Sequence, residues 1–462
     1  MNRIVIIGGG ISGLAAAHRV LELNQAAQVT ILEASAQLGG TIQTTLRDGF
    51  LLERGPDSFI SEKPQALALA KRLGLESQLI QTNEEFRRSF IVRDGRLRAV
   101  PEGFQLMAPS RMWPFITSDI FSLAGKARMA ADLVLPRKHT NGDESLASFV
   151  RRRLGEEALA RMAQPMVGGI YTADPETLSL RATLPRFLDM EQKHRSLILA
   201  MLRQGREQKT GTSGARYSLF VSFAQGMQVL IDAVTQIKTD LFMKTRAQRI
   251  SFDRGWRIYT DQNEKIEAEA VCLAVPAYVA ASLVGDVDAR LAEKLRTIKY
   301  ASTATINLAY RRAAIAHPLN GFGFVVPFIE KRSLIACTFS SVKFAGRAPD
   351  DHVLLRAFAG GALQPEIFAL DEAEMSRRVE ADLRELLGIR EDPRFTEVAK
   401  WERSMPQYEV GHLDRVNEIE GLVNQLPGLA LAGNAYRGAG IPDCVRSGEA
   451  AAESLLNHRA SA

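Results

Sequence analysis

Cysteine is scarce in this chain of 462 residues, and its distribution excludes two classes of structure. The three cysteines, Cys272, Cys337 and Cys444, are far apart, and no C-x-x-C pair is present. Structural zinc sites and disulfide frameworks both require cysteines at characteristic spacings. We therefore expect free thiols in a reducing compartment, with neither a metal site nor a disulfide framework.

Long apolar runs and a strong charge of one sign are also missing. No uninterrupted apolar run reaches about 18 residues, so the sequence predicts no membrane-spanning helix. Met1 is followed almost directly by an apolar segment, which leaves no space for a signal peptide. The net charge of +5 is scattered, and the tight basic cluster at 151–153 is compensated by Glu156 and Glu157. We expect a cytoplasmic protein that does not bind nucleic acid.

The side-chain arrangements of hydrolytic and nucleophilic enzymes are absent too. The sequence offers no Ser-His-Asp, Cys-His or paired-carboxylate arrangement with suitable spacing. The histidines show no metal-ligand spacing and are expected to be surface or packing residues. No catalytic side chain is therefore predicted.

What the chain does contain is a glycine-rich turn near its start. Gly8, Gly10 and Gly13 lie between the apolar residues 4–7 and an alanine-rich helix expected over 12–23, and Glu33 follows further on. This is the G-x-G-x-x-G fingerprint of a dinucleotide-binding unit, whose glycines allow a tight turn, close approach of a pyrophosphate and close helix packing. The helix N–H groups would face the phosphates, and the carboxylate would accept hydrogen bonds from a ribose. The sequence predicts an adenine dinucleotide site.

Two features favour FAD over NAD. A second glycine pair, Gly39 and Gly40, follows the acidic residue closely, as expected where the backbone passes near the rest of a large ligand. Near the other end of the chain, the apolar segment 429–435 leads through a glycine-rich turn into a helix expected over 443–456. This second helix N-terminus can contact a flavin, whereas a nicotinamide dehydrogenase would not need such a return to the cofactor.

The order of the expected strands and helices indicates an α/β fold with a discontinuous Rossmann-type FAD-binding domain, a mixed-sheet substrate domain and a helical subdomain. We expect the FAD-binding domain to comprise residues 1–85, 217–290 and 415–462, the substrate domain residues 86–104 and 291–414, and the helical subdomain residues 105–216.

Longer motifs resemble one group of flavoproteins. The segments GGGISGLAAA, LEASAQLGGTIQT and ERGPDSF resemble the monoamine-oxidase-like flavoproteins. More specifically, PMVGGIYTADPETLS at 165–179 and GNAYRGAGIPDC at 433–444 are similar to the oxygen-dependent protoporphyrinogen oxidases and coproporphyrinogen III oxidases. The similarity extends over the whole chain, and its GIY-x-x-D-x-x-x-LS element is far more specific than the N-terminal fingerprint.

The resemblance implies an FAD-dependent oxidoreductase that acts on CH–CH groups. It would convert protoporphyrinogen IX or coproporphyrinogen III to the porphyrin, with oxygen as acceptor and release of hydrogen peroxide, in haem biosynthesis. Because pyrrole nitrogens shed protons, no strong protein base is needed, and positioning of the ring is the main task of the protein. The partners implied are the porphyrinogen, oxygen and a haem-pathway enzyme that receives the porphyrin, and the chain would be a monomer or homodimer. A flavin amine oxidase or a carotenoid-type desaturase, which share the fold, is the alternative.

In that family FAD is bound noncovalently, and the matching positions imply a cofactor site. The glycine-rich turn would hold the pyrophosphate, Glu33 and Ala34 the adenosine ribose, and Ala247, where the family commonly has valine, would contact the adenine loosely. The implied cofactor-binding residues are Gly8, Gly9, Gly10, Ile11, Ser12, Gly13, Glu33, Ala34, Thr41, Gly55, Pro56, Asp57, Ser58, Ala247, Asn434, Ala439, Gly440 and Ile441.

The resemblance also implies four substrate-binding residues. Gly169 would present its carbonyl to a pyrrole N–H with no side chain in the way, although Gly168 and Gly169 are equally suited to capping a helix. Phe322 and Val325 would flank the macrocycle, whereas periodicity alone favours a core strand. The family places an arginine for a propionate just before the strand at 90–92. Ser89 occupies that position here, so the role passes to Arg88, one residue earlier.

Large apolar residues also stand among turn signals at 103–108 and 112–116. Trp113 and Phe115 lie near basic side chains in the sequence, as is typical of a contact at the level of lipid headgroups. The resemblance makes the helical subdomain the membrane-facing part of the molecule, and a cavity wall or core is the alternative. We expect a soluble, cytoplasmic protein with weak, salt-sensitive peripheral attachment to the cytoplasmic face of a membrane.

Overall fold

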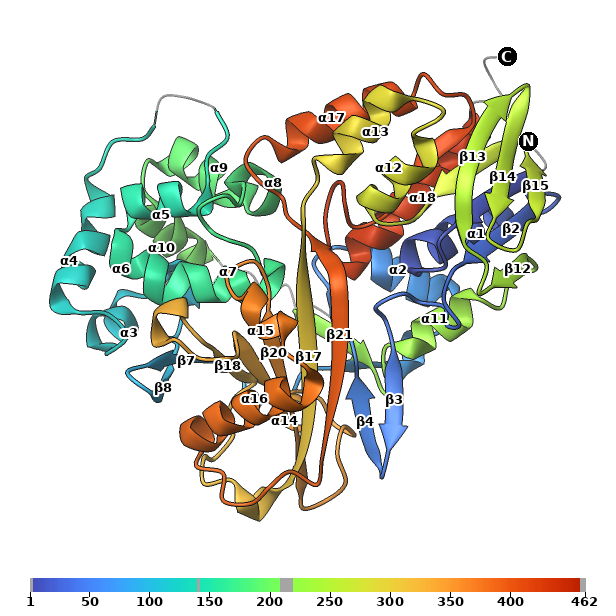
Figure 1. The fold of residues 1–462 in the computed structure, drawn as a ribbon. Helices are drawn as coiled ribbons and strands as arrows, with labels where there is room; N and C mark the ends of the chain where they lie inside the picture. Colours follow the sequence, from blue (N-terminus) through green and yellow to red (C-terminus); the bar gives the residue numbers. More distant parts are fainter. Residues whose placement is uncertain (1–2, 139–141, 208–218, 458–462) are drawn as a thin grey trace.

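The computed structural model describes residues 3–138, 142–207 and 219–457, which form a mixed α/β structure with several sheets. Figure 1 shows a helical part at the left, a parallel sheet with its helices at the right, and a large mixed sheet at the lower centre. Segments from both ends of the chain meet in the parallel-sheet part.

The parallel sheet is buried on both faces. Its strands, from edge to edge, are β12 (Asp240–Met243), β2 (Gln28–Glu33), β1 (Arg3–Ile7), β16 (Ala270–Leu273) and β22 (Leu429–Leu431). All neighbouring pairs run parallel. Strands covered on both faces consist of nearly continuous apolar residues, and residues 4–7 are accordingly buried. The carboxyl ends of the strands therefore meet at one edge, which is where ligands bind in such sheets.

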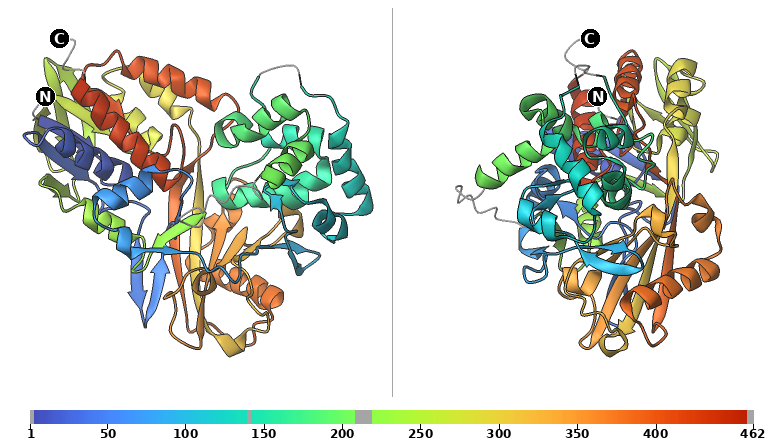
Figure 2. Two further views of the ribbon diagram at one scale, coloured as in Figure 1. Left: turned by 180° about the vertical axis from the view of Figure 1, so that it is seen from behind. Right: turned by 90° about the vertical axis from the view of Figure 1, so that its left-hand side faces the viewer.

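Helices cover one face of this sheet, and a smaller sheet with further helices covers the other. The first face carries α1 (Ile11–Leu23), α2 (Gln65–Arg72), α11 (Gln228–Val234) and α18 (Ile441–Asn457), which share one apolar core. The second face carries β13 (Ala247–Asp253), β14 (Gly255–Thr260), β15 (Lys265–Ala268), α12 (Ala277–Val284), α13 (Ala289–Arg296) and α17 (His412–Val423). The first and last of these helices in the chain, α1 and α18, lie side by side (Figure 2).

The large mixed sheet has seven strands. In order they are β21 (Phe395–Pro406), β17 (Tyr300–Arg311), β20 (His352–Gly360), β19 (Ala336–Phe339), β18 (Gly323–Val325), β7 (Phe90–Arg93) and β8 (Arg96–Ala99). Only the pairing of β7 with β18 is parallel among these strands. The helix α16 (Glu372–Leu387) packs on the sheet through Met375, Val379 and Leu383, whose spacing of four residues places them on one helix face. Asp371 caps the start of this helix, and Gly388 in the left-handed region ends it.

The helical part is built around its own apolar core and a buried ion pair. Its helices are α3 (Met112–Thr117), α4 (Leu123–Ala130), α5 (Leu146–Arg153), α6 (Glu156–Ala158), α7 (Gln164–Tyr171), α8 (Leu180–Thr183), α9 (Pro185–His194) and α10 (Leu197–Glu207). The side chains of Arg153 and Asp132 are fully buried, and Arg153 Nε donates to Asp132 Oδ1 at 2.7 Å. Breaking such a pair on one side leaves an uncompensated buried charge, so the pair fixes how these helices meet.

Phe115 and Trp113, for which a lipid contact and a core position were the two alternatives, lie in different surroundings. Phe115 is only 1% exposed and packs against Phe104 and Phe121, so it belongs to the core and not to a lipid contact. Trp113, two residues earlier, is 75% exposed. Within the three described stretches, no helix is both long and apolar enough to cross a bilayer.

Candidate cofactor and substrate site

The glycine-rich turn joins β1 to α1 with almost no space between them. Gly8 adopts a φ of +110°, and its N–H donates to the carbonyl of Leu32 at 2.8 Å. A Cβ on Gly13 would lie 1.9 Å from the carbonyl oxygen of Gly8. No side chain fits there, so α1 can begin directly on the turn only because this residue is glycine.

Gly10, in contrast, faces open space. A Cβ added to Gly10 would have no described heavy atom within 4 Å, and no side chain caps α1, whose N-cap residue is Gly10 itself. The first N–H groups of a helix lack intrahelical partners and carry the positive end of its dipole. The turn therefore forms a cradle for an anionic group that approaches the backbone closely, as the pyrophosphate of a dinucleotide does.

Glu33 lies beside this cradle at the end of β2. Its Oε2 accepts the N–H of Gly9 at 2.8 Å, and its Oε1 accepts the N–H of Ser35 at 2.7 Å. The backbone N–H of Thr245 donates to the carbonyl of Glu33, which brings the segment leading to Ala247 alongside. This arrangement brings Glu33, Ala34 and Ala247 to one end of the parallel sheet.

Two further glycine-containing loops complete the cradle. The N–H of Gly39 donates to the carbonyl of Gly9 at 2.8 Å. A Cβ on Gly55 would lie 1.8 Å from the carbonyl oxygen of Thr41. The loop at 39–41 is therefore in backbone contact with both the N-terminal turn and the segment 55–58.

Asp57, in that segment, is held by charges that the sequence did not reveal. Lys343 Nζ lies 3.0 Å from Asp57 Oδ2, and Arg356 lies 3.5 Å from Asp57 Oδ1. Burial alone would raise the pKa of the Asp57 carboxyl, but the two cations outweigh it and hold that pKa well below its usual range. Ser58 donates to the same carboxylate, and Arg356 also donates to the carbonyl of Gly55 at 3.0 Å. The mixed sheet thereby fixes the predicted flavin-lining segment.

The C-terminal segment reaches the same region from the opposite side. A Cβ on Gly448 of α18 would lie 2.1 Å from the carbonyl oxygen of Ser12, so α18 crosses α1 in backbone contact (Figure 2). The N–H of Gly433 donates to Ser447 Oγ at 3.1 Å, and Asn434 Nδ2 donates to the carbonyl of Ser404 at 3.2 Å. Asn434 is thus bonded to β21 (Phe395–Pro406), and α18, which begins at Ile441, packs along α1.

The predicted substrate residues Gly169 and Val325 lie against each other. A Cβ on Gly169 would lie 3.7 Å from Val325 Cγ1, so an alanine would just touch the neighbouring strand. Gly168 and Gly169 lie inside α7, and the helix ends at Thr172, which has a φ of +50°. Capping by the glycines is therefore wrong, because Thr172 is the cap residue. A π-helical turn, Leu159–Ala163, precedes α7, a feature that is frequent at functional sites.

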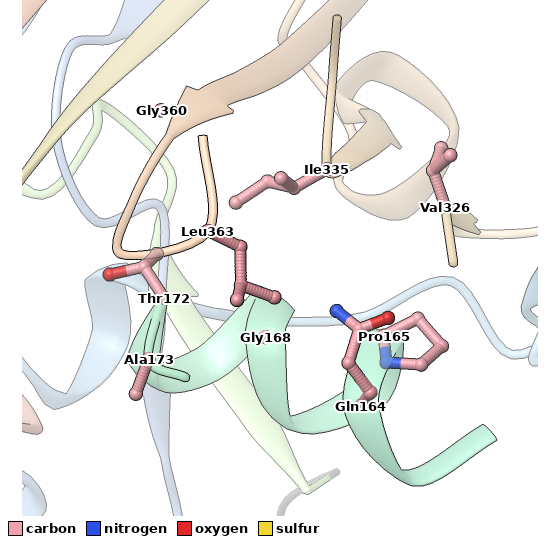
Figure 3. A pocket seen from close by; sticks show the side chains of 9 residues that line it. All are labelled: Gln164, Pro165, Gly168, Thr172, Ala173, Val326, Ile335, Gly360 and Leu363. Atoms are coloured by element: carbon pink, nitrogen blue, oxygen red, sulfur yellow. The ribbon is translucent and has the colours of Figure 1, made fainter. Parts of the chain in front are cut away.

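Gly168 lines a small pocket between α7 and the mixed sheet (Figure 3). The side-chain amide of Gln164 accepts the N–H of Phe328 at 2.9 Å, which ties the start of α7 to the segment after β18. The pocket is lined by Gln164, Pro165, Gly168, Thr172, Ala173, Val326, Ile335, Gly360 and Leu363.

Arg88 and Phe322 are also brought together, through their backbones. The N–H of Phe322 donates to the carbonyl of Arg88 at 2.8 Å. Arg88 is exposed and Phe322 is half-buried. Phe322 lies just before β18, and the half-buried Val325 ends that strand. The four substrate positions therefore lie along β18, just before β7 and on the adjoining α7.

Comparison with known proteins identifies the family. Residues 11–456 match the model of the family described as flavin containing amine oxidoreductase. The chain belongs to this family. It is a flavoprotein and an oxidoreductase, and its cofactor is FAD, which confirms the choice of FAD over NAD.

The sequence similarity to named relatives extends over nearly the whole chain. The chain is 36% identical to the coproporphyrinogen III oxidase of Bacillus subtilis (strain 168), over 99% of this chain and 98% of the relative. It is 30% identical to the chloroplastic protoporphyrinogen oxidase of Nicotiana tabacum, over 96% of this chain and 83% of the relative. These matches confirm the resemblance to porphyrinogen oxidases.

Solved structures confirm the overall fold. A crystal structure from Exiguobacterium sp. 255-15, named provisionally as a protoporphyrinogen oxidase, superimposes with a TM-score of 0.88 at 31% identity, covering 98% of each chain. The cyclohexylamine oxidase of Brevibacterium oxydans IH-35A superimposes with a TM-score of 0.72 at 16% identity, covering 99% of each chain, which shows a common fold alone.

Proposed function

We propose that this chain oxidises coproporphyrinogen III to coproporphyrin III. The observation that carries this proposal is the match to relatives named coproporphyrinogen III oxidase, at 36%, 35% and 32% identity. Each match covers at least 98% of this chain and 90% of the relative. The plant relatives named protoporphyrinogen oxidase, from Nicotiana tabacum, Oryza sativa, Spinacia oleracea and Arabidopsis thaliana, match at 26–30% identity.

The FAD would bind across a discontinuous Rossmann-type domain. The open cradle at Gly10 supports placement of the pyrophosphate at the start of α1, and the carboxylate of Glu33 would turn from Gly9 to the adenosine ribose. Thr41, the segment 55–58, Asn434 and residues 439–441 would approach the flavin ring. The close contacts of Gly55 with Thr41 and of α18 with α1 support this placement.

The protein's task in the reaction would be to bind and orient the macrocycle. Bound FAD supplies a two-electron acceptor, which is reoxidised by oxygen with release of hydrogen peroxide. A porphyrinogen loses six electrons and six protons, so one porphyrin corresponds to three oxygen molecules consumed and three peroxide molecules formed.

Gly169 would orient the macrocycle through its backbone. The last carbonyl groups of a helix lack intrahelical N–H donors, and Gly169 lies in the last turn of α7. Its carbonyl could therefore accept a pyrrole N–H, and the absence of a side chain would let the ring approach. Val325 and Phe322 would contact the ring, and Arg88 would pair with a carboxylate.

A substrate panel tests the proposed activity. Purified holoprotein should produce fluorescent porphyrin from coproporphyrinogen III faster than from protoporphyrinogen IX, with about three peroxide molecules per porphyrin and no need for NAD(P)H. Faster oxidation of a polyamine or of phytoene would instead assign the chain to the amine oxidases or to the desaturases.

We also propose a peripheral membrane contact on the helical part. Trp113 and Ile116 of α3 and Leu123 of α4 are 75%, 52% and 84% exposed. Lys126 Nζ donates to the carbonyl of Ile116 at 2.7 Å, so the two short helices lie together with a cation beside the apolar residues. This α3–α4 surface (Trp113, Ile116, Leu123) has the composition of a headgroup-level contact with an anionic, cytoplasmic membrane face.

A further inference from the structure

A short connector, residues 407–412, joins β21 to α17, includes the first residue of that helix, and carries two buried aromatic rings. Tyr408 is 2% exposed and His412 is fully buried. Their rings stack with centroids 4.0 Å apart and planes 12° from parallel. Burial lowers the pKa of His412 to about 4, so the imidazole is neutral at physiological pH.

The two side chains hold the backbone of the C-terminal loop, residues 433–438. Tyr408 Oη accepts the N–H of Gly438 at 2.9 Å and donates to the carbonyl of Asn434. His412 Nε2 lies 2.8 Å from the carbonyl of Tyr436, to which it donates as the neutral ring. Three alternate residues of the loop are thus fixed by two side chains that lie about thirty positions earlier.

The backbone of the same connector is bound to the helical part. The N–H of Ser179 donates to the carbonyl of Tyr408 at 2.7 Å, and the N–H of Val410 donates to the carbonyl of Thr177 at 2.9 Å. Asp143 Oδ2 accepts both the N–H of Gly411 at 2.9 Å and the hydroxyl of Ser179 at 2.7 Å. Ser179 is the end of the 165–179 motif that carries Gly169, so the connector pairs with the continuation of α7.

We propose that Tyr408, His412 and Asp143 are positioning residues that set the substrate wall at α7 and the flavin-contacting loop at 433–438 in register. The inference rests on the proposed contact of Asn434 and residues 439–441 with the flavin. The backbone of the connector is bonded to the 165–179 segment, and its side chains are bonded to the loop at 433–438. A displacement of the 165–179 segment is therefore transmitted through the connector to the loop at 433–438. In the reverse direction, binding of flavin at that loop orders the substrate wall at α7.

The first test removes the tyrosine hydroxyl. Tyr408→Phe leaves the N–H of Gly438 and the carbonyl of Asn434 without their buried partner. Titration of apoprotein with FAD should show a dissociation constant about ten- to a hundredfold higher than that of the wild type. Hydrogen exchange of the peptide that contains Gly438 should accelerate, and the kcat of the FAD-saturated enzyme should fall more than its KM rises.

Tyr310→Phe is the matched control, because Tyr310 is also 2% exposed but lies in β17 of the mixed sheet. It should leave the FAD dissociation constant and the exchange near Gly438 unchanged. Equal effects of the two substitutions would overturn the proposal. Faster exchange at Gly438 with unchanged FAD affinity would overturn it as well, because the loop would then not serve the cofactor.

The second test separates coupling from local support. Asp143→Ala loosens the connector from the helical part while Tyr408 and His412 keep their contacts, and it should raise the FAD dissociation constant about three- to tenfold. In the Asp143→Ala/Tyr408→Phe double variant, the rise in the FAD dissociation constant should be smaller than the product of the rises in the two single variants, since both substitutions act through one connector. A purely multiplicative result would refute the coupling. These readouts use FAD alone, so they stand even if the substrate is not a porphyrinogen.

The histidine gives a third, independent check. His412→Gln places an amide N–H near the position of Nε2 and should retain most of the wild-type FAD affinity, whereas His412→Leu should lose it to the same extent as Tyr408→Phe. Equal affinities of the two histidine variants would contradict a role for the hydrogen bond to Tyr436.

Discussion

Substitution of Gly10 by alanine should abolish tight FAD binding without harming the fold. Gly10 has ordinary extended backbone angles, φ −73° and ψ 173°, which alanine adopts freely. Its added Cβ would meet no described atom within 4 Å. The apoprotein should therefore lose on the order of 1 kcal/mol of stability, because alanine is a poorer N-cap residue than glycine.

The cost of Gly10→Ala falls on the bound cofactor, because the methyl group would stand where the pyrophosphate approaches the turn. Displacing the phosphates removes one or two charge-assisted hydrogen bonds from helix N–H groups, each worth about 1.5–3 kcal/mol. The loss of about 1.5–6 kcal/mol corresponds to a rise in the FAD dissociation constant of roughly ten- to ten-thousandfold.

Gly13→Ala is the opposite case and serves as the comparison. Its Cβ would lie 1.9 Å from the carbonyl oxygen of Gly8, so α1 would have to move away from the turn. Overpacking of this kind costs typically about 1–3 kcal/mol, and the thermal midpoint of the apoprotein should fall. Apoprotein melting and FAD titration by flavin fluorescence should separate the two variants. Wild-type FAD affinity in a folded Gly10→Ala variant would refute placement of the pyrophosphate at this turn.

Three further outcomes are expected. Gly169→Val should lower kcat/KM at least tenfold with unchanged FAD affinity, because the branched side chain fills the space beside Val325; unchanged turnover would remove Gly169 from the substrate wall. His412 takes up a proton near pH 6.5 when unfolded but only near pH 4 when folded, so stability should fall by up to about 3 kcal/mol as the pH is lowered through that window. Urea melts should show a steeper loss of stability between pH 6.5 and pH 4 in the wild type than in His412→Gln, because other partly buried histidines remain in both proteins. Trp113→Ser/Leu123→Ser should reduce flotation with anionic vesicles, and equal flotation of the folded variant would exclude the α3–α4 surface as the contact.

The elements that carry the dinucleotide fingerprint could be predicted because their signals are local. Helices expected over 12–23 and 443–456 correspond to α1 (Ile11–Leu23) and α18 (Ile441–Asn457). Glycine spacing, apolar runs and helix starts are determined within about ten residues of one another, so the sequence contains the whole signal.

Contacts between distant segments could not be predicted in this way. Asp57 is bonded to Lys343, 286 residues later in the chain, and no spacing rule connects them. Likewise, Phe115 and Trp113 share one short apolar segment, yet only the rotation of α3 on its core decides that Phe115 is buried and Trp113 exposed. Whether Gly168 and Gly169 cap α7 depends in the same way on where that helix ends. Thr172, in a left-handed conformation, is the cap residue, and the spacing of the glycines does not reveal this.

Anaerobic mixing of the purified yellow holoprotein with coproporphyrinogen III tests the proposed function most directly. We expect the flavin to bleach in a single phase whose rate matches or exceeds aerobic turnover, and its colour to return when oxygen is admitted, with peroxide formed. A flavin that stays oxidised with the porphyrinogen but bleaches rapidly with an amine would contradict the proposal and assign the chain to the amine oxidases of its family.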